Sequence, residues 1–233
     1  MKQCVFYSAG QTEALAYSVK YLQAAGCTFT AEPDCKTTHL MLDVPFKNPE
    51  KLPELLLQLP KDVTIVGGNL NVPGYRVVDL LQDPFYLAEN ADITAHGAVK
   101  LALGLLPVTL KGLPCLVIGW GRIGKCLARL LRQMGAVVTV AARKEADRAM
   151  LSALGYDAID VTAISSHYRI IYNTAPAPIH VEEQPEDCLK IELASVPGLA
   201  GDNIIDGRAL PNRCAPESSG QLIARRILQL CCQ

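Results

Sequence analysis

The middle of the chain shows the clearest pattern of hydrophobic and polar positions. An apolar run at residues 115–118 is followed by three glycines, and leucines then recur at helical spacing up to Gly135. A second apolar run, rich in β-branched residues, occupies positions 137–140. A strand, a helix and a strand in this order, within about thirty residues, predict a βαβ unit with two parallel strands.

The glycines of this unit, Gly119, Gly121 and Gly124, have the GxGxxG spacing of a dinucleotide-binding turn. The first glycine permits a tight turn, the second lets a pyrophosphate approach the backbone, and the third lets helix and strand pack closely. The phosphates would bind the free N–H groups at the helix N-terminus, where Arg122 and Ile123 lie. We therefore predict a dinucleotide site. The alternative is a glycine turn with a purely structural role.

The end of the second strand bears on which dinucleotide would bind. An acidic residue about 20 residues beyond the fingerprint normally binds the free ribose 2′-hydroxyl of NAD. This chain has Arg143 and Lys144 there, and its first acid is Glu145. Because guanidinium groups bind phosphate oxygens through paired, charge-assisted hydrogen bonds, NADP is favoured over NAD. The alternative is that the two cations form a solvated pair at a helix start.

The N-terminal part of the chain has an α/β pattern of its own. Apolar runs predict strands near 4–7, 27–30, 39–42 and 63–66. Helical periodicity predicts helices over 12–25 and 53–59 and a short helix over 75–81. We expect these elements to form a small open sheet covered by helices.

The segments that flank the βαβ unit complete a larger sheet. A helix is predicted over 94–105 with Thr94 as its N-cap, and strands are predicted near 158–161, 169–173, 189–193 and at Cys214, which makes a six-stranded sheet. The fold class is therefore α/β, a Rossmann-type doubly wound parallel sheet with a second, smaller α/β domain. The smaller domain is placed at 1–92 and the dinucleotide-binding domain at 93–217, and a final helix over 218–231 is expected to pack on the smaller domain.

Composition and charge narrow the classes of function. The 233 residues are 50% hydrophobic and carry a formal net charge of −1, so neither nucleic acid nor an anionic membrane is indicated as a partner. Lysines and prolines interrupt the longest apolar stretch, 98–118, and the N-terminus lacks a signal-peptide pattern, so we expect a cytoplasmic protein. The nine cysteines show no metal-ligand spacing, and no metal site is predicted.

Candidate chemistry lies where strands end, because the ligands of doubly wound sheets bind beyond the carboxyl ends of the strands. Small, amide and hydroxyl side chains stand at these positions in the later part of the chain and would line the nicotinamide ring: Asn173, Thr174, Ala175, Pro176, Ala194 and Ser195. Hydride transfer often needs a proton acceptor, and His96, at the predicted helix start, is the best placed of the four histidines. Together with Ser195 it is a candidate for catalysis; the alternative is a structural or solvent-exposed histidine.

Several motifs resemble, in the same order, those of the family of dipicolinate synthase A-type subunits. They are ITAHGAVKLALG, VIGWGRIGKCLARLLRQMGAVVTVAARK, YNTAPAPI, ELASVPGLAG and APESSGQLIARRIL. The resemblance covers the chain roughly from Thr94 to the C-terminus. It implies an NAD(P)-dependent oxidoreductase subunit that works with a flavoprotein-like partner, the B-type subunit, during sporulation. Together the two subunits would convert a cyclic product of the aspartate and lysine pathway to pyridine-2,6-dicarboxylate.

The resemblance also implies the two-domain architecture of D-2-hydroxyacid and alanine dehydrogenases. By position it assigns the glycine turn and Arg143 to the dinucleotide, and Asn173, Thr174 and Ser195 to the nicotinamide side. The N-terminal domain is short for the family, and the chain differs from the family pattern at three places. Residues 7–10 stand where a glycine-rich turn with an acid is usual, and His96 and Glu217 stand where a glutamate and a lysine are usual.

Three functions follow from these observations. The first is an NADP-dependent oxidoreductase subunit that acts on a small carboxylated heterocycle, with NAD as the other cofactor, a flavoprotein-like partner of the B type, and homo-oligomer formation left open. The second is a non-catalytic NADP-binding partner or sensor subunit, which the altered N-terminal residues favour, whereas the nicotinamide-side residues favour the first function. The third is a D-2-hydroxyacid dehydrogenase, for which the chain lacks a recognisable set of arginine, acid and histidine.

Overall fold

The computed structural model describes residues 4–181 and 183–232 and divides the chain into two compact units. Unit 1 consists of the residues up to Asn90 together with the C-terminal segment from Ala215, and unit 2 consists of Ala91–Cys214. The sequence placed the corresponding boundaries after residues 92 and 217. The chain thus leaves unit 1, forms unit 2, and returns to unit 1.

Unit 1 is built on a five-stranded, entirely parallel sheet in the order β2-β1-β3-β4-β5. Its strands are β1 Val5–Ser8, β2 Thr28–Phe29, β3 His39–Met41, β4 Thr64–Gly67 and β5 Arg76–Asp79. Its helices are α1 Glu13–Ala24, the 3₁₀ helix η1 Pro49–Lys51, α2 Leu52–Leu56, the 3₁₀ helix η2 Leu80–Gln82 and α7 Pro216–Cys231. The four strands predicted for this part of the chain are confirmed.

The short helix predicted over 75–81 is wrong. Residues 76–79 form β5, and only 80–82 turn into a 3₁₀ helix. The two β-branched residues Val77 and Val78 pair in register with Ile65 and Val66 of β4, so strand pairing overrides the local helical periodicity. Asp79 then caps the next turn by accepting a hydrogen bond from the N–H of Leu81 at 2.8 Å.

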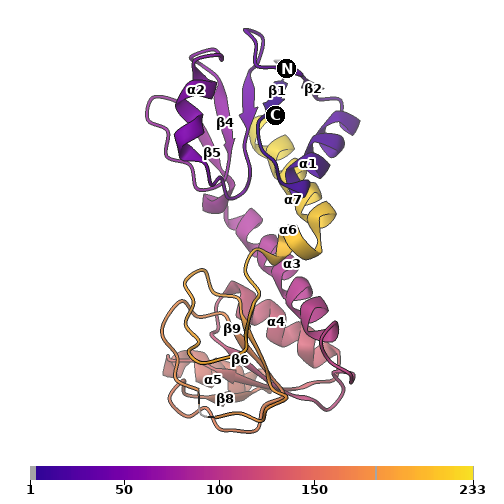
Figure 1. Ribbon diagram of the computed structural model, residues 1–233, viewed down its shortest axis with the longest axis vertical. Coiled ribbons are helices and arrows are strands. Elements are labelled where there is room, and N and C mark those ends of the chain that lie inside the picture. The colour runs from indigo at the N-terminus through magenta and orange to yellow at the C-terminus, as the bar shows by residue number, and fades with distance from the viewer. Residues whose placement is uncertain (1–3, 182, 233) are drawn as a thin grey trace. The chain divides into compact units, whose positions relative to one another are not determined.

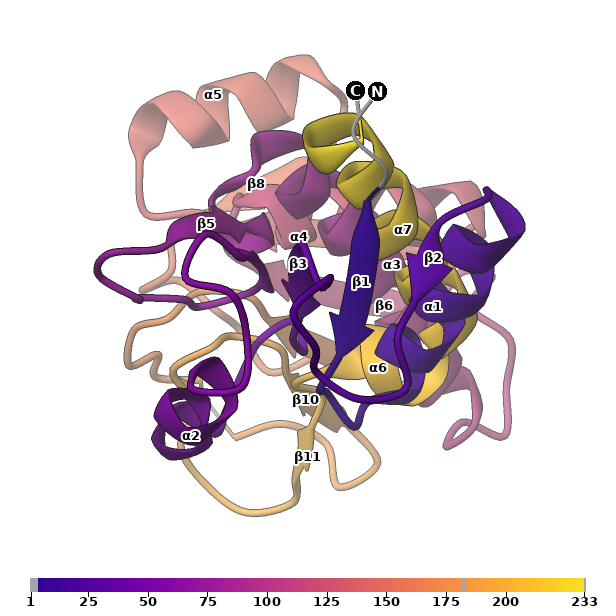
Figure 2. The same ribbon diagram turned by 90° about the horizontal axis from the view of Figure 1, so that it is seen from above.

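Helices α1 and α7 pack side by side, although they come from opposite ends of the chain (Figures 1 and 2). The hydroxyl of Tyr21 donates to Glu217 Oε1 at 2.7 Å, and an ion pair between Arg226 and Asp83 joins α7 to the residue before α3. Gly220 lies where the two helices approach most tightly, because a Cβ there would be 2.5 Å from Tyr17 Cβ. The last helix is therefore an integral part of unit 1.

Replacing Gly220 with valine should destabilise unit 1 by about 1–3 kcal/mol, because the added side chain has no room between the helices. Besides Tyr17 Cβ, the new Cβ would meet the carbonyl oxygen of Ala14 at 2.6 Å. The measurement is chemical denaturation of the whole chain, with Ser218→Val in the same helix as the control. Ser218 is exposed, so that control should stay within about 0.5 kcal/mol of the unmodified chain. Equal effects at the two positions would contradict the close approach.

Unit 2 is built on a six-stranded, entirely parallel sheet in the order β11-β10-β9-β6-β7-β8. The strands are β6 Pro114–Ile118, β7 Val137–Ala141, β8 Asp157–Ile159, β9 Ile170–Asn173, β10 Leu189–Glu192 and β11 Ile204–Asp206. From β6 the chain moves outward to β7 and β8, then returns to the other side of β6 for β9, β10 and β11. The strand order therefore reverses between β6 and β9, the point where doubly wound sheets bind ligands.

Two layers cover this sheet. One face packs against α3 Pro84–Leu103, α4 Arg122–Gln133, α5 Glu145–Ala153 and α6 Leu210–Cys214, with buried residues such as Leu127 and Leu131. The other face packs against Ile164, Tyr168 and Ile179. These three residues come from the segments 160–169 and 174–188, which contain no helix in their described parts. The prediction of an α/β, Rossmann-type sheet beside a second α/β unit is confirmed.

Two element boundaries in this region differ from the prediction. Cys214 was expected in a strand but ends the short helix α6, and the sixth strand is β11. The helix expected over 94–105 begins at Pro84, so Thr94 is a buried residue inside α3 and not its N-cap. Proline is favoured in the first turn of a helix, and Asp83 accepts a hydrogen bond from the N–H of Phe85 at 3.1 Å, which fixes the earlier start.

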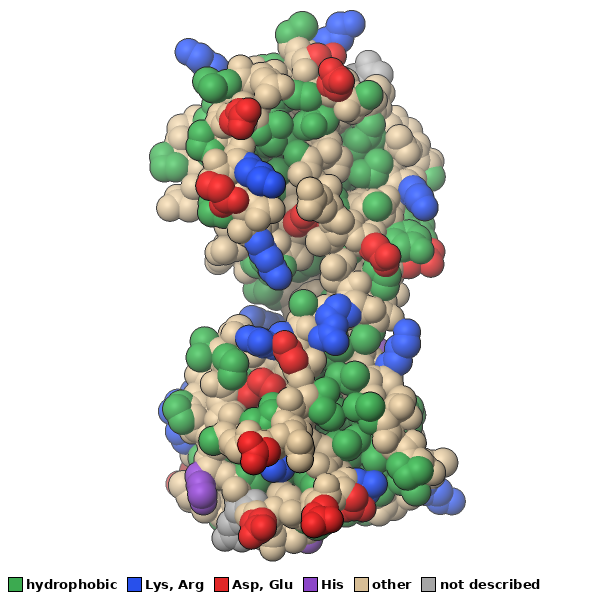
Figure 3. Space-filling view, in the orientation of Figure 1, with side chains coloured by type: hydrophobic (Ala, Val, Ile, Leu, Met, Phe, Trp, Pro, Cys, Tyr) green, Lys and Arg blue, Asp and Glu red, His purple; other side chains and the backbone are tan. Residues whose placement is uncertain are grey.

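The surface has a mixed character. Lysine and arginine side chains and aspartate and glutamate side chains are interspersed on the visible face of each unit, among scattered apolar groups (Figure 3). Among the described residues, no helix combines the length and apolar character needed to cross a membrane.

Candidate functional site

The turn after β6 has the backbone geometry that its three glycines predict. Gly119 has a φ of +102°, in the left-handed region that favours glycine. A Cβ at Gly124 would be 2.1 Å from the carbonyl oxygen of Gly119, so the helix can approach the turn only without a side chain there. A Cβ at Gly121, by contrast, would meet no atom within 4 Å. The second glycine therefore borders open space, where a ligand can approach the backbone.

Helix α4 begins at this open space. Gly121 is its N-cap, and no described side chain caps its first turn. The N–H groups of the first turn of a helix have no partner inside the helix, and they attract anions together with the helix dipole. Arg122 at the start of α4 is exposed, and Ile123 is partly buried against the core. This arrangement suits a pyrophosphate group.

The turn is tied to the adjacent strand β9. Thr174, the first residue after β9, donates from both its backbone N–H and its hydroxyl to the carbonyl oxygen of Ile118, at 2.9 and 2.8 Å. The carboxyl ends of β6 and β9 are therefore held together at the point where the strand order reverses. The Thr174 hydroxyl, predicted to face the nicotinamide ring, thus donates its hydrogen bond within the protein.

Two cations stand at the carboxyl end of β7. Arg143 and Lys144 are exposed, and neither forms an ion pair within the described part of the chain. The turn that carries them is held by Arg148, whose guanidinium donates to the carbonyl oxygens of Ala142 and Arg143 at 2.7 and 2.8 Å. Arg148 also pairs with Asp160 at 2.6 Å. The two exposed cations thus project from a rigid turn next to the glycine turn, one strand away.

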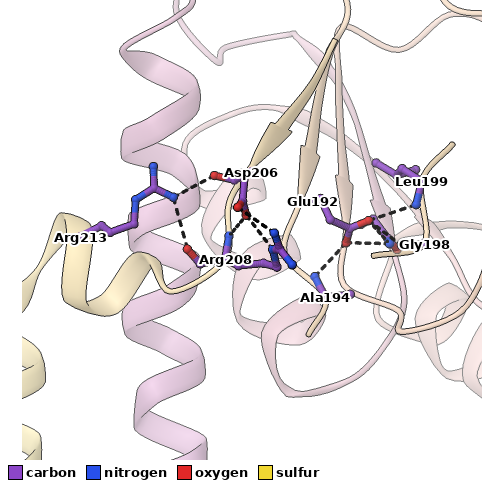
Figure 4. Close-up of polar contacts among 8 residues, drawn as sticks. Glu192, Ala194, Gly198, Leu199, Asp206, Arg208 and Arg213 are labelled. Atoms are coloured by element: carbon purple, nitrogen blue, oxygen red, sulfur yellow. Dashed lines mark hydrogen bonds and ion pairs between the residues drawn. The ribbon is translucent and has the colours of Figure 1, made fainter. Parts of the chain in front are cut away.

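A buried carboxylate that the sequence reasoning missed lies at the carboxyl end of β10 (Figure 4). Glu192 is 3% exposed and accepts hydrogen bonds from the N–H groups of Ala194, Gly198 and Leu199 at 2.9, 2.8 and 3.0 Å. The side-chain amide of Asn173 lies 2.9 and 3.0 Å from its two oxygens. The sequence signal for this residue was a glutamate at the end of an apolar strand, because a charged side chain is buried there only when other groups pair with it.

The Asn173 side chain is fully engaged inside the protein. Its amide nitrogen also donates to the carbonyl oxygen of Ala175 at 3.1 Å, and its own oxygen accepts from the N–H of Ala175 at 3.0 Å. Asn173 is completely buried, whereas Pro176 and Ser195 are exposed. The residues predicted for the nicotinamide side therefore lie on two neighbouring loops, one after β9 and one after β10. The buried side chains of Asn173 and Glu192 determine the shape of these loops.

A second polar cluster follows β11 (Figure 4). Arg208 donates from Nε and Nη2 to the two carboxylate oxygens of Asp206, each at 2.9 Å, and this pairing lowers the pKa of Asp206 to about 2. Arg213 donates to the carbonyl oxygens of Asp206 and Arg208 at 2.9 and 3.3 Å. Asp206 is the register partner of Glu192 on the neighbouring strand, but its side chain is 56% exposed. The cluster stabilises the connection from β11 to α6.

His96 does not lie at the start of a helix, so its predicted position is wrong. It lies inside α3 with a 60% exposed side chain, and its Nε2 is 3.7 Å from Asp92 Oδ2. Asp92 in turn accepts from Arg129, in the second half of α4, at 3.0 Å. Because α4 begins at the glycine turn, this contact places Asp92 and His96 beside the body of α4 and away from its N-terminus.

We therefore expect His96→Ala to leave the affinity for either dinucleotide within about twofold, which corresponds to about 0.4 kcal/mol. An exposed side chain with one weak ionic contact contributes little to the neighbouring fold. The measurement is calorimetric titration of both cofactors, with Asp92→Asn as a second variant that removes the partner. A tenfold loss of cofactor affinity in the histidine variant would place His96 at the cofactor site.

At the carboxyl edge of its sheet, unit 1 has a small cavity of about 60 Å³, lined by Ala9, Gln11, Leu42, Asp43, Phe46, Asn48, Lys51, Leu52 and Leu55. Asp43 closes one side by accepting from the N–H groups of Gln11 and Thr12 at 2.9 and 3.0 Å. The lining residues include Gln11, Asn48 and Lys51, whose side chains carry amide and ammonium groups that can donate hydrogen bonds.

The glycine turn with its open space, the uncapped helix start and the two exposed cations together fit a dinucleotide with a phosphorylated ribose. A relative from Bacillus subtilis (strain 168), the A-type subunit of dipicolinate synthase, is 27% identical over 170 residues. This match covers 66% of the chain and 57% of the relative, so it spans little more than half of that protein. The chain resembles the A-type subunit of dipicolinate synthase. No family model matches it.

Solved structures extend the likeness to the whole fold. The A-type subunit of dipicolinate synthase from Bacillus halodurans has a TM-score of 0.79 at 18% identity, and the match covers 98% of this chain and 97% of that one. Transhydrogenase from Sinorhizobium meliloti has a TM-score of 0.69 at 13% identity, with coverage of 97% and 92%. Salmonella D-lactate dehydrogenase has a TM-score of 0.55 at 15% identity, with coverage of 87% and 72%. The predicted resemblance to this synthase family is confirmed, and the chain shares its α/β fold with these dehydrogenase and transhydrogenase structures.

Proposed function

We propose that the chain is an NADP-dependent oxidoreductase subunit that acts on a small carboxylated heterocycle, as the name of its relative, a dipicolinate synthase, implies for that protein. The observation that carries the proposal is the glycine turn, in which the first and third glycines are required by the backbone and the second faces open space. A purely structural turn would not need the second glycine, whereas a bound pyrophosphate does.

Each part of the site would have a separate task. The N–H groups at the start of α4 would bind the pyrophosphate, with Gly119, Gly121, Arg122, Ile123 and Gly124 forming the turn. Arg143 and Lys144 would bind the ribose 2′-phosphate. The loops that contain Ala175, Pro176, Ala194 and Ser195 would enclose the nicotinamide ring, which supplies or accepts the hydride when bound.

The substrate and the partner are inferred from chemistry and from the relative. A dicarboxylated ring needs hydrogen-bond donors, and the residues that line the cavity of unit 1 include Lys51, Gln11 and Asn48, which carry such donors. The relative is named as one subunit of its synthase, which implies a second, so we propose a flavoprotein-like partner of the B type. We also propose that the protein functions in the cytoplasm.

The proposal is tested by titrating the purified chain with NADP and NAD and then measuring turnover. Binding of NADP with higher affinity than NAD is the first expected result. Cyclic dicarboxylates of the lysine pathway are then supplied, with and without a flavoprotein-like partner, and the absorbance of the reduced nicotinamide is followed. Failure to bind either dinucleotide would contradict the proposal at its first step.

A second function is favoured by one observation. Asn173 at the end of β9 and Thr174 directly after it make hydrogen bonds within the protein, and His96 lies beside the body of α4. A chain whose polar nicotinamide-side groups are engaged in this way, and whose candidate histidine lies away from the glycine turn, would suit a non-catalytic NADP-binding partner or sensor subunit. Tight NADP binding without turnover, in the presence of the partner and the full set of substrates, would select this function.

A further inference from the structure

The Glu192 carboxylate is buried, yet its hydrogen-bond donors in the described part of the chain are all neutral amides. Burying a carboxylate is costly unless hydrogen bonds replace its hydration. Here four N–H groups do so: the side-chain amide of Asn173 and the backbone amides of Ala194, Gly198 and Leu199. The backbone amides of residues 198 and 199 donate to the same oxygen, in the manner of an anion-binding nest.

The N–H groups around Glu192 require both of its carboxylate oxygens to act as hydrogen-bond acceptors. Oε1 accepts from Asn173 and Ala194, and Oε2 accepts from Asn173, Gly198 and Leu199. An ionised carboxylate is acceptor-only, whereas a glutamine would turn an NH₂ group toward at least one N–H donor. The surrounding N–H donors thus require a carboxylate on a side chain of this length. This requirement points to a role beyond filling the core.

The carboxylate connects two loops that are far apart in the sequence. Through Asn173 it orients the loop after β9, and through Gly198 and Leu199 it orients the loop after its own strand, β10. The loops touch directly, because a Cβ at Gly198 would be 2.1 Å from the carbonyl oxygen of Ala177. The N–H of Ile179 also donates to the Gly198 carbonyl at 2.8 Å. Removing the carboxylate would therefore release both loops together.

We propose that Glu192 is a positioning residue that holds the loops after β9 and β10 in the shape that receives the nicotinamide ring. This inference rests on the proposed function, because it concerns the nicotinamide half of the same dinucleotide site. The phosphate-binding half is built after β6 and β7 and makes its own hydrogen bonds, from Gly119 to Ala141 and from Arg148 to Ala142 and Arg143. Glu192 should therefore affect one half of the ligand only.

The test compares two ligands that differ by the nicotinamide group. The unmodified chain and Glu192→Gln are titrated calorimetrically with NADP and with 2′-phospho-ADP-ribose, which lacks nicotinamide. We expect the variant to bind NADP about tenfold or more weakly, which corresponds to about 1.4 kcal/mol. Its affinity for 2′-phospho-ADP-ribose should stay within about twofold. A merely structural role would change both affinities alike.

Asp206→Asn is the matched control, because Asp206 is the register partner of Glu192 on β11 and is exposed. It removes one carboxylate charge from the same end of the sheet and should change neither affinity. If the unmodified chain binds neither ligand, the proposed function itself fails. If the unmodified chain binds NADP and Glu192→Gln binds it equally well, or loses both ligands equally, the positioning role is wrong and the proposed function stands.

A second variant covers the case in which Glu192→Gln does not fold. Asn173→Ser removes the amide that joins the loop after β9 to Glu192 but leaves the three backbone donors in place. It should show the same selective loss of NADP affinity relative to 2′-phospho-ADP-ribose. Unchanged binding of both ligands by this variant, with circular dichroism identical to that of the unmodified chain, would overturn the proposal.

Discussion

Gly121→Val is expected to abolish detectable binding of both NADP and NAD. The added Cβ and its methyl groups would occupy the open space beside the backbone, where no protein atom lies within 4 Å. The ligand would lose charge-assisted hydrogen bonds to the first turn of α4, each worth about 1.5–3 kcal/mol. A loss of about 3 kcal/mol or more is a reduction in affinity of more than about a hundredfold. Titration calorimetry with each dinucleotide measures it.

The contrast with Gly124 makes this prediction specific. Because Gly121 borders open space at an ordinary φ of −80°, its valine variant should keep the circular dichroism and unfolding temperature of the unmodified chain. In Gly124→Ala the new Cβ would meet the Gly119 carbonyl oxygen at 2.1 Å, so that variant should lose stability as well as binding. Tight dinucleotide binding by Gly121→Val would show that the turn is structural only.

Arg143→Ala should weaken NADP binding by about ten- to a hundredfold and leave NAD binding nearly unchanged. The exposed guanidinium is free to pair with a 2′-phosphate, and a hydrogen bond to a charged group contributes about 1.5–3 kcal/mol. NAD has a hydroxyl at that position and gains little from the cation. Titrating both cofactors against both proteins isolates the contribution of the 2′-phosphate.

Salt and a conservative replacement sharpen this second test. Because the site is exposed, the preference for NADP should decrease as ionic strength rises from low to physiological values. Arg143→Lys retains the charge but loses the paired donors, so its NADP affinity should lie between those of the alanine variant and the unmodified chain. An equal loss of NADP and NAD affinity in Arg143→Ala would mean that Arg143 acts through the fold of the turn and not through the 2′-phosphate.

Local rules were sufficient for the βαβ unit and for most strands. The positions of Gly119, Gly121 and Gly124 depend on backbone sterics over a short stretch of chain, so the spacing alone predicted which glycines the turn needs and which one borders open space. The largely buried parallel strands β6, β7 and β9 are rich in apolar residues, and such segments are visible in a short sequence window.

The start of α3 was signalled locally, because Asp83 precedes Pro84 and accepts from the N–H of Phe85, and it places Thr94 and His96 inside the helix. Two other features were decided only by the tertiary structure. The segment 76–79 became a strand because β4 offered it a partner. Glu192 shows the same limit for the site. Its partners Asn173 and Leu199 are 19 and 7 residues away in the sequence, and a buried carboxylate becomes informative only when its donors are known. The sequence by itself determined the glycine turn and the parallel strands, because these depend on neighbouring residues; long-range pairing decided the strand at 76–79 and the shape of the loops after β9 and β10.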